Sequence, residues 1–380
     1  MEGSRQVGEK ISEWGMHPGP GRGRDVLAPG SAIALTALLL AGCSHQAVGP
    51  PPPPPVDWYA LSTSGAASAP QNAPTAWERD MADAYVTALA SPGLAQLGAR
   101  LHPNAEGSFS GSQAVHGRDQ VVSLHELVFG AFDQRTVIAT RVLRTAAAQA
   151  IEWTMTGTQI RDWMGVPPTH RPVAFKGVTL LWTHDDGTIV DAHIYFDVAV
   201  VKAELGAGPK ELVSPPISRD TAPRVRLAQT GSPVEMSNVA TMRASLDAVE
   251  AKDEAAYLAS MTDDVEIYTL ERGDPMRGRA GAGAYYAAMD HAIGQLDTSI
   301  AHVWGIERFV VVEYSIAGIQ LGPVGWVPVM RDRVLGLHIV DVAELRDGRI
   351  ARIWRYDNPQ EIAADNRDAA ITAQSLRRRT

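Results

Sequence analysis

The sequence predicts an α+β protein made of two copies of one domain. Helical patterns precede a run of strand patterns, and this order occurs twice along the chain. The sequence EWTMTGTQ, which begins at Glu152, has a counterpart in EYSIAGIQ, which begins at Glu313, an offset of 161 residues (313 − 152). The same offset joins Gly117 to Gly278. A repeat of this length indicates duplicated globular domains, because solenoid units are shorter.

The first copy opens with helices whose apolar side chains recur at helical spacing. One face carries Trp77, Met81, Tyr85 and Leu89, and a second helix follows Asp119. Segments rich in β-branched and aromatic residues then predict strands at residues 137–143, 150–158, 173–182 and 188–198. We expect these strands to form a curved antiparallel sheet against which the N-terminal helices pack.

The second copy repeats this order. Its first helix carries Val239, Met242, Leu246 and Val249 on one face. Its strands are expected at residues 304–316, 334–345 and 349–356. We therefore expect one domain over residues 76–206, a linker over 207–235, a second domain over 236–364 and a solvated tail over 365–380.

The N-terminal region has the pattern of an exported and lipid-anchored protein. Residues 1–42 contain a short apolar run, from Ala32 to Leu40, that is too short to span a bilayer and indicates a signal peptide. Leu40-Ala41-Gly42-Cys43 resembles the bacterial lipobox, so Cys43 is the expected lipidation site. Residues 43–75 are rich in proline and predict an extended tether. These features place the protein on a membrane of the bacterial cell envelope.

Composition narrows the classes of partner and of chemistry. The chain has 380 residues and a net charge of −9, which argues against nucleic acid as a partner because phosphate binding needs a basic surface. Cys43 is the single cysteine, so the chain has no internal disulfide and no thiolate metal cluster. The histidines are scattered without metal-ligand spacing, and no glycine-rich phosphate loop follows a strand. We expect neither a metal nor a cofactor.

The order of motifs then suggests a family. Gly117-Arg118-Asp119, Phe129-Gly130-Ala131-Phe132-Asp133 and EWTMTGT from Glu152 occur in sequence, followed by Asp197 near the end of the last strand. In this order and spacing the first copy resembles the SnoaL-like polyketide cyclases of the nuclear transport factor 2-like superfamily, and the second copy resembles them more weakly. The resemblance implies a cone-shaped domain with a pocket between sheet and helices. It also implies that Asp197 is the general acid/base of an intramolecular ring closure.

The faces of the last strand of the first copy decide which side chains reach that pocket. Side chains alternate along a strand, so His193, Tyr195 and Asp197 share one face, while Ile194 and Phe196 share the other. The repeat aligns the first face with apolar residues of the second copy, including Trp354 and Tyr356, and aligns the second with Arg355 and Asp357, which we read as solvated. We therefore expect His193, Tyr195 and Asp197 to face the pocket as a catalytic group, with a raised pKa for Asp197.

Five further residues of the first copy are candidates for ligand contact. They are Trp153, Met155, Trp163, Trp182 and His125. Residues of these types in such patterns are more often core residues, or in the case of His125 core or rim residues, than ligand contacts. Asn358 stands in the second copy where the first has Asp197, so chemistry through that position is expected only in the first domain. The sequence leaves two functions open: a cyclase or isomerase acting on a small apolar carbonyl compound, or a non-catalytic module that binds a small apolar molecule or a protein.

The two copies are also expected to pair within the chain. Domains of this superfamily often dimerise through their sheets, and a duplicated chain can satisfy that surface internally. The facing rows would be Glu152, Thr154 and Thr156 in the first copy and Glu313, Ser315 and Ala317 in the second. We expect a pseudo-two-fold pair and a monomeric protein.

Overall fold

The computed structural model describes residues 76–111, 114–210, 212, 225–329 and 334–363. Both predicted domains lie within one compact unit. The predicted leader, Cys43, the tether and the whole predicted tail fall outside the described residues, as does part of the predicted linker. Among the helices that are described, none is long and apolar enough to cross a membrane.

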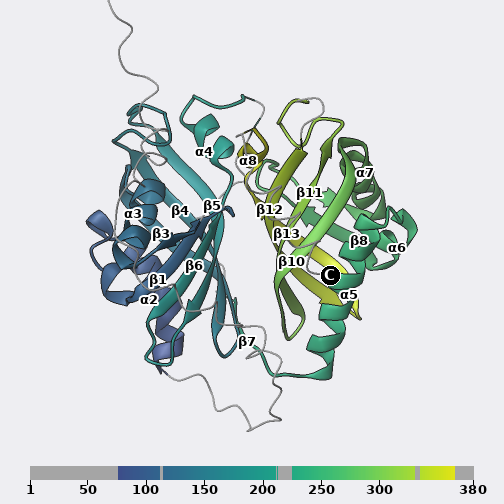
Figure 1. Cartoon of the computed structure of the whole chain (residues 1–380), viewed down its shortest axis with the longest axis horizontal. Helices are drawn as coiled ribbons and strands as arrows, with labels where there is room; N and C mark the ends of the chain where they lie inside the picture. The colour runs from purple at the N-terminus through teal and green to yellow at the C-terminus, as the bar shows by residue number, and fades with distance from the viewer. Residues whose placement is uncertain (1–75, 112–113, 211, 213–224, 330–333, 364–380) are drawn as a thin grey trace, which may run out of the picture. The chain divides into compact units, whose positions relative to one another are not determined.

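The first domain combines a seven-stranded sheet with helices on one of its faces (Figure 1). Its helices are α2 (Ala76–Ala90), α3 (Arg118–Phe129) and α4 (Val198–Glu204), with short 3-10 turns η1 (Pro92–Leu94) and η2 (Gly98–Arg100). Its strands are β1 (Leu101–Phe109), β2 (Val115–His116), β3 (Phe132–Arg144), β4 (Ala148–Gln159), β5 (Pro172–Thr183), β6 (Ile189–Tyr195) and β7 (Val225–Ala228). The order across the sheet is β2-β1-β6-β5-β4-β3-β7.

The second domain has the same plan with six strands. Its helices are α5 (Pro233–Glu250), α6 (Glu254–Ala259), α7 (Gly278–Ala292) and α8 (Gln360–Ala363). Its strands are β8 (Met261–Tyr268), β9 (Met276–Arg277), β10 (Ile293–Ile306), β11 (Phe309–Gln320), β12 (Val334–Arg346) and β13 (Arg349–Asp357), in the order β10-β11-β12-β13-β8-β9. The predicted α+β class of two tandem domains is confirmed.

Two features of the strands differ from expectation. The expected strand at 304–316 is the end of β10 and the start of β11, because a tight turn at Glu307 and Arg308 separates them, and Glu307 has a positive φ of 50°. Strand β1 escaped prediction because its sequence is polar and contains Pro103, which is typical of a loop. It pairs in parallel with β6 and is buried at Leu101 and Ala105.

The repeated octapeptide performs the same three tasks in both domains. Its aromatic residue, Trp153 or Tyr314, is buried in the domain core. Its final glutamine donates to carbonyl groups of the following loop: Gln159 Nε2 donates to Val166 and Pro167, and Gln320 Nε2 donates to Pro328. These bonds tie the loop to the end of the strand that carries the glutamine. The recurrence of Gln in the sequence therefore has a structural cause.

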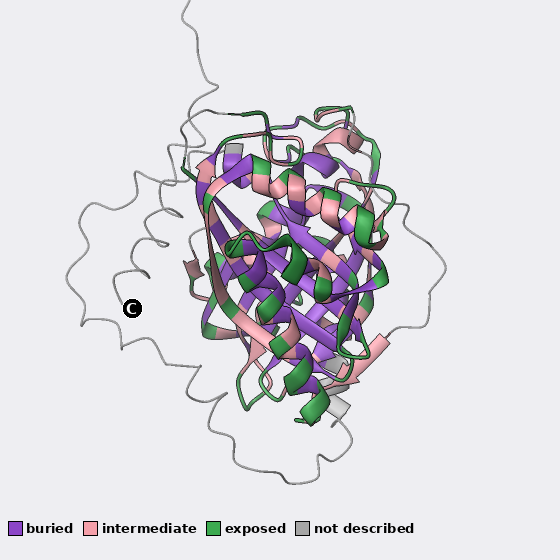
Figure 2. Cartoon of the chain, turned by 90° about the vertical axis from the view of Figure 1, so that its right-hand side faces the viewer, coloured by how far each residue is buried: buried purple, intermediate pink, exposed green. Residues whose placement is uncertain are grey.

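The first residue of the octapeptide lies on the other face of each sheet, where the two domains touch. Glu313 Oε1 accepts a hydrogen bond from the Tyr195 hydroxyl at 2.7 Å, and Glu152 Oε1 accepts one from the Tyr356 hydroxyl. Apolar residues of β11 and β12 join the core cluster of the first domain there, among them Val311 and Val340. Burial is consequently concentrated on the strands, and exposed residues lie mainly on helices and loops (Figure 2).

Candidate functional site

The interior of the first domain is filled by aromatic rings. Phe196 packs against Trp163, Phe175 and Trp153, with ring centroids 6.2, 5.2 and 6.4 Å apart. Phe129 meets the edge of Trp153 at 5.5 Å. All five side chains are at most 3% exposed. The space in which a ligand was expected between sheet and helices is therefore occupied by the protein itself.

The candidate ligand contacts of this domain are core residues. Met155 is fully buried, Trp153 Nε1 donates to Thr179 Oγ1 at 3.0 Å, and Trp163 Nε1 donates to the Val128 carbonyl at 2.9 Å. Each indole thus has an internal partner, as buried tryptophans normally do. The expectation that these three residues line a pocket was wrong, because their polar atoms and their faces are already engaged within the core.

His125 and Trp182 also have internal surroundings. His125 Nδ1 lies 2.8 Å from the Val121 carbonyl, and its Nε2 lies 3.0 Å from the Tyr85 hydroxyl. Burial lowers the pKa of His125 to about 4, so the ring is neutral. Trp182 lies instead at the contact between the domains, with its ring centroid 4.7 Å from that of His302 of the second domain. Neither residue lies with Trp153 around a common cavity.

The predicted orientation of the last strand of this domain was also wrong. His193 Nδ1 and the Tyr195 hydroxyl both contact Glu313 of the second domain at 2.7 Å, while Phe196 occupies the core. The hydrophobic pattern alone would have given the right faces. The repeat misled because Trp354 and Tyr356 are aromatic yet face the other domain, where the Arg141 guanidinium lies 3.7 Å from the Trp354 ring.

Asp197 takes a structural position at the start of α4. It is 2% exposed, and its Oδ1 accepts hydrogen bonds from the backbone N–H of Ala199 at 2.7 Å and of Val200 at 3.4 Å. This is the geometry of a helix N-cap. Burial raises the pKa of Asp197 to about 7, in the predicted direction. Among the described residues, no hydrogen bond joins Asp197 to His193 or Tyr195, so the expected catalytic group is not assembled.

The second domain, in contrast, contains a cavity of about 500 Å³ between α7 and the sheet. Apolar side chains form most of its wall: Met276, Ala288, Met289, Ile293, Ile316, Val324, Leu337 and Ile339. Its polar lining comes chiefly from Tyr285, Arg355, Asp357 and Glu271. Volumes of this size and composition are typical of small-molecule sites.

A buried ion pair holds the polar end of the cavity. Arg355 Nε and Nη2 donate to the two carboxylate oxygens of Asp341 at 2.9 and 2.7 Å. Nη2 also donates to the Tyr314 hydroxyl at 2.7 Å, and that hydroxyl donates to Asp341 Oδ2 at 2.9 Å. Burial disfavours the charged guanidinium, but Asp341 outweighs it and keeps the pKa of Arg355 well above its usual range. Arg355 is therefore a fixed cation.

Two groups beside this ion pair can exchange hydrogen bonds with a ligand. Arg355 Nη1 donates to the Tyr285 hydroxyl oxygen, which leaves the hydrogen of that hydroxyl available in the cavity wall. Burial raises the pKa of Tyr285 to about 12. Burial and the charge of Glu271 raise the pKa of Asp357 well above its usual range, against the opposing effect of Arg355. Both groups thus carry a proton under conditions in which exposed carboxyls have lost theirs.

Sequence reasoning missed this site because it treated Arg355 and Asp357 as solvated. One signal was present in the sequence. Asp341 stands in the apolar run from Leu335 to Ala343 and has no acceptable place in such a strand without a buried cation. Searching neighbouring strands for that cation would have led to Arg355. No cluster of His, Cys, Asp and Glu among the described residues could hold a metal ion.

Comparison with known families agrees with this architecture. The family model for SnoaL-like polyketide cyclases matches residues 79–205, and the model for the SnoaL-like domain matches residues 242–353. The chain carries two SnoaL-like domains. The family predicted for the first copy and for the second is thereby confirmed. The domain that contains the cavity and the domain whose interior is filled are therefore related to each other.

Solved structures similar to this chain each span about a third of it. A protein described as a SnoaL-like polyketide cyclase from Jannaschia sp. CCS1 is 22% identical, with 37% of this chain and 100% of that one covered and a TM-score of 0.32. A polyketide cyclase from Silicibacter sp. TM1040 is 23% identical, with 33% and 92% covered and a TM-score of 0.30. An LEH-like epoxide hydrolase from M. tuberculosis is 18% identical, with 36% and 93% covered and a TM-score of 0.29. Curated proteins show no match.

Proposed function

We propose that the second SnoaL-like domain binds a small, largely apolar molecule that carries a carbonyl or hydroxyl oxygen at one end. The observation that carries the proposal is the 500 Å³ cavity with apolar walls and a polar end at Tyr285, Arg355 and Asp357. Burial against the walls favours binding of the apolar part of the ligand. The ligand oxygen favours binding only where it can reach a hydrogen-bond donor. The first domain then acts as a structural partner.

We further propose that the polar end supports proton transfer of the cyclase or isomerase type. The Tyr285 hydroxyl, polarised by Arg355, can donate to a ligand carbonyl and stabilise negative charge that develops on it. A buried carboxyl such as Asp357, whose pKa burial and the charge of Glu271 raise well above its usual range, is suited to give a proton to the ligand and take one back. Asp341 positions Arg355 and does not itself face the ligand in this scheme.

The test separates binding from chemistry with paired variants. Small carbonyl compounds are first screened by their effect on the melting temperature of the full chain. Ala288→Phe, which places a ring in the cavity wall, should abolish the shift that any true ligand causes. Asp357→Asn should lower turnover of a hit by roughly 10²–10⁴-fold. Compounds from the screen that still bind to the Ala288→Phe variant would refute the proposed binding site in the cavity. Binding without turnover in the parent protein would leave the non-catalytic module that the sequence also allowed.

Lipid anchoring through Cys43 is proposed on the sequence pattern that precedes it, the apolar run ending in Leu40-Ala41-Gly42. An anchor would hold the ligand-binding domain at a membrane surface of the bacterial cell envelope. Cys43→Ala should move the protein from the membrane fraction to the soluble fraction. Retention of both forms on the membrane after high-salt and carbonate washing would contradict the proposal.

A further inference from the structure

A second hollow, of about 460 Å³, lies on the sheet of the second domain. Four arginines line it: Arg277, Arg308, Arg346 and Arg352. Arg352 is on β13, as Arg355 is, but three residues away and therefore on the opposite face of the strand. The hollow is thus separated from the ligand cavity by the thickness of the sheet.

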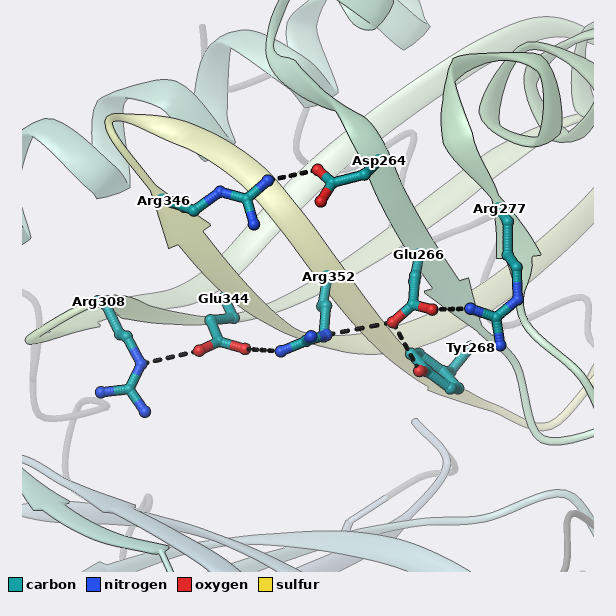
Figure 3. Close-up of polar contacts among 8 residues, drawn as sticks. All are labelled: Asp264, Glu266, Tyr268, Arg277, Arg308, Glu344, Arg346 and Arg352. Atoms are coloured by element: carbon teal, nitrogen blue, oxygen red, sulfur yellow. Dashed lines mark hydrogen bonds and ion pairs between the residues drawn. The ribbon is translucent and has the colours of Figure 1, made fainter.

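The arginines alternate with carboxylates in a row that crosses the strands (Figure 3). Strand pairing places Arg277 of β9 opposite Glu266 of β8, Glu266 opposite Arg352 of β13, and Arg352 opposite Glu344 of β12. Arg308, at the turn before β11, completes the row. Because neighbouring strands lie about 4.8 Å apart, the arginines at every second position are about 10 Å apart.

Ion pairs fix the direction in which the guanidinium groups point. Glu344 accepts from Arg308 Nε at 2.8 Å and from Arg352 Nη1 at 2.9 Å. Glu266 accepts from Arg352 Nε at 3.2 Å and from Arg277, and the Tyr268 hydroxyl donates to it at 2.9 Å (Figure 3). The hydrogen bond from Tyr268, together with Arg352 and Arg277, outweighs the opposing effect of burial and lowers the pKa of Glu266, so it stays ionised.

The outward charge of the row is positive. The side chains of Glu266 and Glu344 are each only 17% exposed, whereas those of the four arginines are 47–66% exposed. Asp264, which pairs with Arg346, is the third carboxylate of the lining and is exposed. Four arginines and three carboxylates leave one net positive charge on a chain whose net charge is −9. A guanidinium has five N–H donors, and these carboxylates engage only one or two from each.

We propose that this hollow binds a small polyanion through its carboxylate or phosphate groups. Arginines that are already oriented lose little freedom when they bind, and their planar forks match both kinds of oxyanion. The spacing of the arginines suits a ligand with more than one anionic group. The first domain lacks such a row: at the matching pairings, Glu106 lies opposite His116 and Asp191. The inference is independent of what the cavity on the other face of the sheet binds.

Isothermal titration of the full chain with citrate and with pyrophosphate at low ionic strength tests the proposal. We expect saturable binding of at least one of them, weakened by added salt. Arg308→Gln and Arg352→Gln should each lower the affinity about tenfold or more. The matched control is Arg100→Gln, which removes the same charge from an exposed arginine of the first domain and should bind like the parent.

Binding of citrate alone would assign a carboxylate ligand, and binding of pyrophosphate alone a phosphate ligand. Absence of binding for both anions would overturn the proposal. So would equal losses in Arg352→Gln and Arg100→Gln, because the effect would then be general charge and not a site. Melting curves of each variant verify folding, and Arg308→Lys provides a milder change in which the charge is kept and only the planar fork is lost.

Discussion

The two domains share a fold but differ inside. The interior of the first, the solid domain, is filled by side chains, whereas the second, the hollow domain, contains a cavity. Strand pairing makes three core positions equivalent: Trp153, Thr179 and Ile194 in the first domain correspond to Tyr314, Asp341 and Arg355 in the second. The 161-residue offset of the repeat adds a fourth, Phe196 and Asp357. Trp153 donates to Thr179 as Tyr314 donates to Asp341, so even the hydrogen bond is retained. The side chains at these equivalent positions differ in their charge and in their volume.

The difference shows how a duplicated domain can be specialised without changing its backbone plan. In the second domain, Asp357 and Val324 stand where the first has the rings of Phe196 and Trp163, and both line the cavity. Because the second domain has smaller side chains at these two positions, the volume that two aromatic rings fill in the first domain is part of the cavity in the second. The buried cation Arg355 is tolerated only because Asp341 lies beside it, since an unpaired charge in such a place would be prohibitively costly. Function on this fold therefore depends on a few positions.

The largest expected effect concerns the ion pair in the hollow domain. Arg355→Met should lower the free energy of unfolding by about 3–5 kcal/mol, because it leaves the Asp341 carboxylate buried without its cation. The equivalent position of the solid domain carries Ile194, and Ile194→Val should cost only about 1 kcal/mol. Denaturant titration of both variants measures the contrast. A loss of less than 1 kcal/mol for Arg355→Met would show that Asp341 is not held as a buried ion.

Next in size is the conversion of the solid domain into a hollow one. Phe196→Ala removes a ring that contacts Trp163, Phe175 and Trp153, and should cost about 3–4 kcal/mol through lost burial and a residual cavity. The new space is apolar and should accept a small aromatic molecule such as benzene, detected by a rise in melting temperature. Asp357→Ala in the domain that already has space should cost much less. Equal losses for the two variants would contradict the comparison.

The contacts between the domains differ in their response to pH. Glu152 pairs with the guanidinium of Arg141 at 2.8 Å, whereas Glu313 contacts the imidazoles of His193 at 2.7 Å and His302 at 2.6 Å. Burial lowers the pKa of His193, but Glu313 and Asp191 outweigh it and raise that pKa well above the value of a free imidazole. Because the folded pKa is raised, this stabilisation is complete below the unfolded value of about 6.5 and is lost as pH rises through the folded pKa.

The expected result is a difference between two matched variants. Glu313→Gln should cost about 1.5–3 kcal/mol at pH 6, as a charge-assisted contact does, and progressively less towards pH 9. Glu152→Gln should cost a similar amount at both pH values. Tyr195, His338 and Glu361 also lie near the His193 cluster, and Glu361, whose pKa burial raises to about 7, lowers stability as pH rises. Glu361 is present in the parent and in both variants, and Glu313 raises the pKa of His338 in the same direction as that of His193, so its loss acts on both histidines alike. A constant cost for Glu313→Gln would disprove the histidine contribution.

The smallest expected effect concerns Asp197 and tests whether this residue acts as a helix N-cap or as a catalytic acid. Asp197→Ala should cost about 1 kcal/mol through loss of its bonds to the start of α4. Asp197→Asn keeps an acceptor and should cost less, and it should remove a contribution to the pH dependence of stability near neutrality, because the carboxyl pKa of about 7 is absent. Its counterpart, Asn358, already carries an amide and accepts from the Val198 N–H at 3.3 Å. Identical pH profiles for parent and Asp197→Asn would show that Asp197 does not titrate there.

Sequence by itself determined the duplication, the α+β class, most of the strands and the SnoaL-like family, because periodicity and turn residues are local signals. Tertiary structure alone decided what covers the second face of the last strand. In the first domain Ile194 and Phe196 already indicate the core face, but the other domain also buries the face that carries His193 and Tyr195. Tyr356 is aromatic and faces the other domain, while Arg355 is charged and faces the cavity, because only Asp341 on the neighbouring strand neutralises it there.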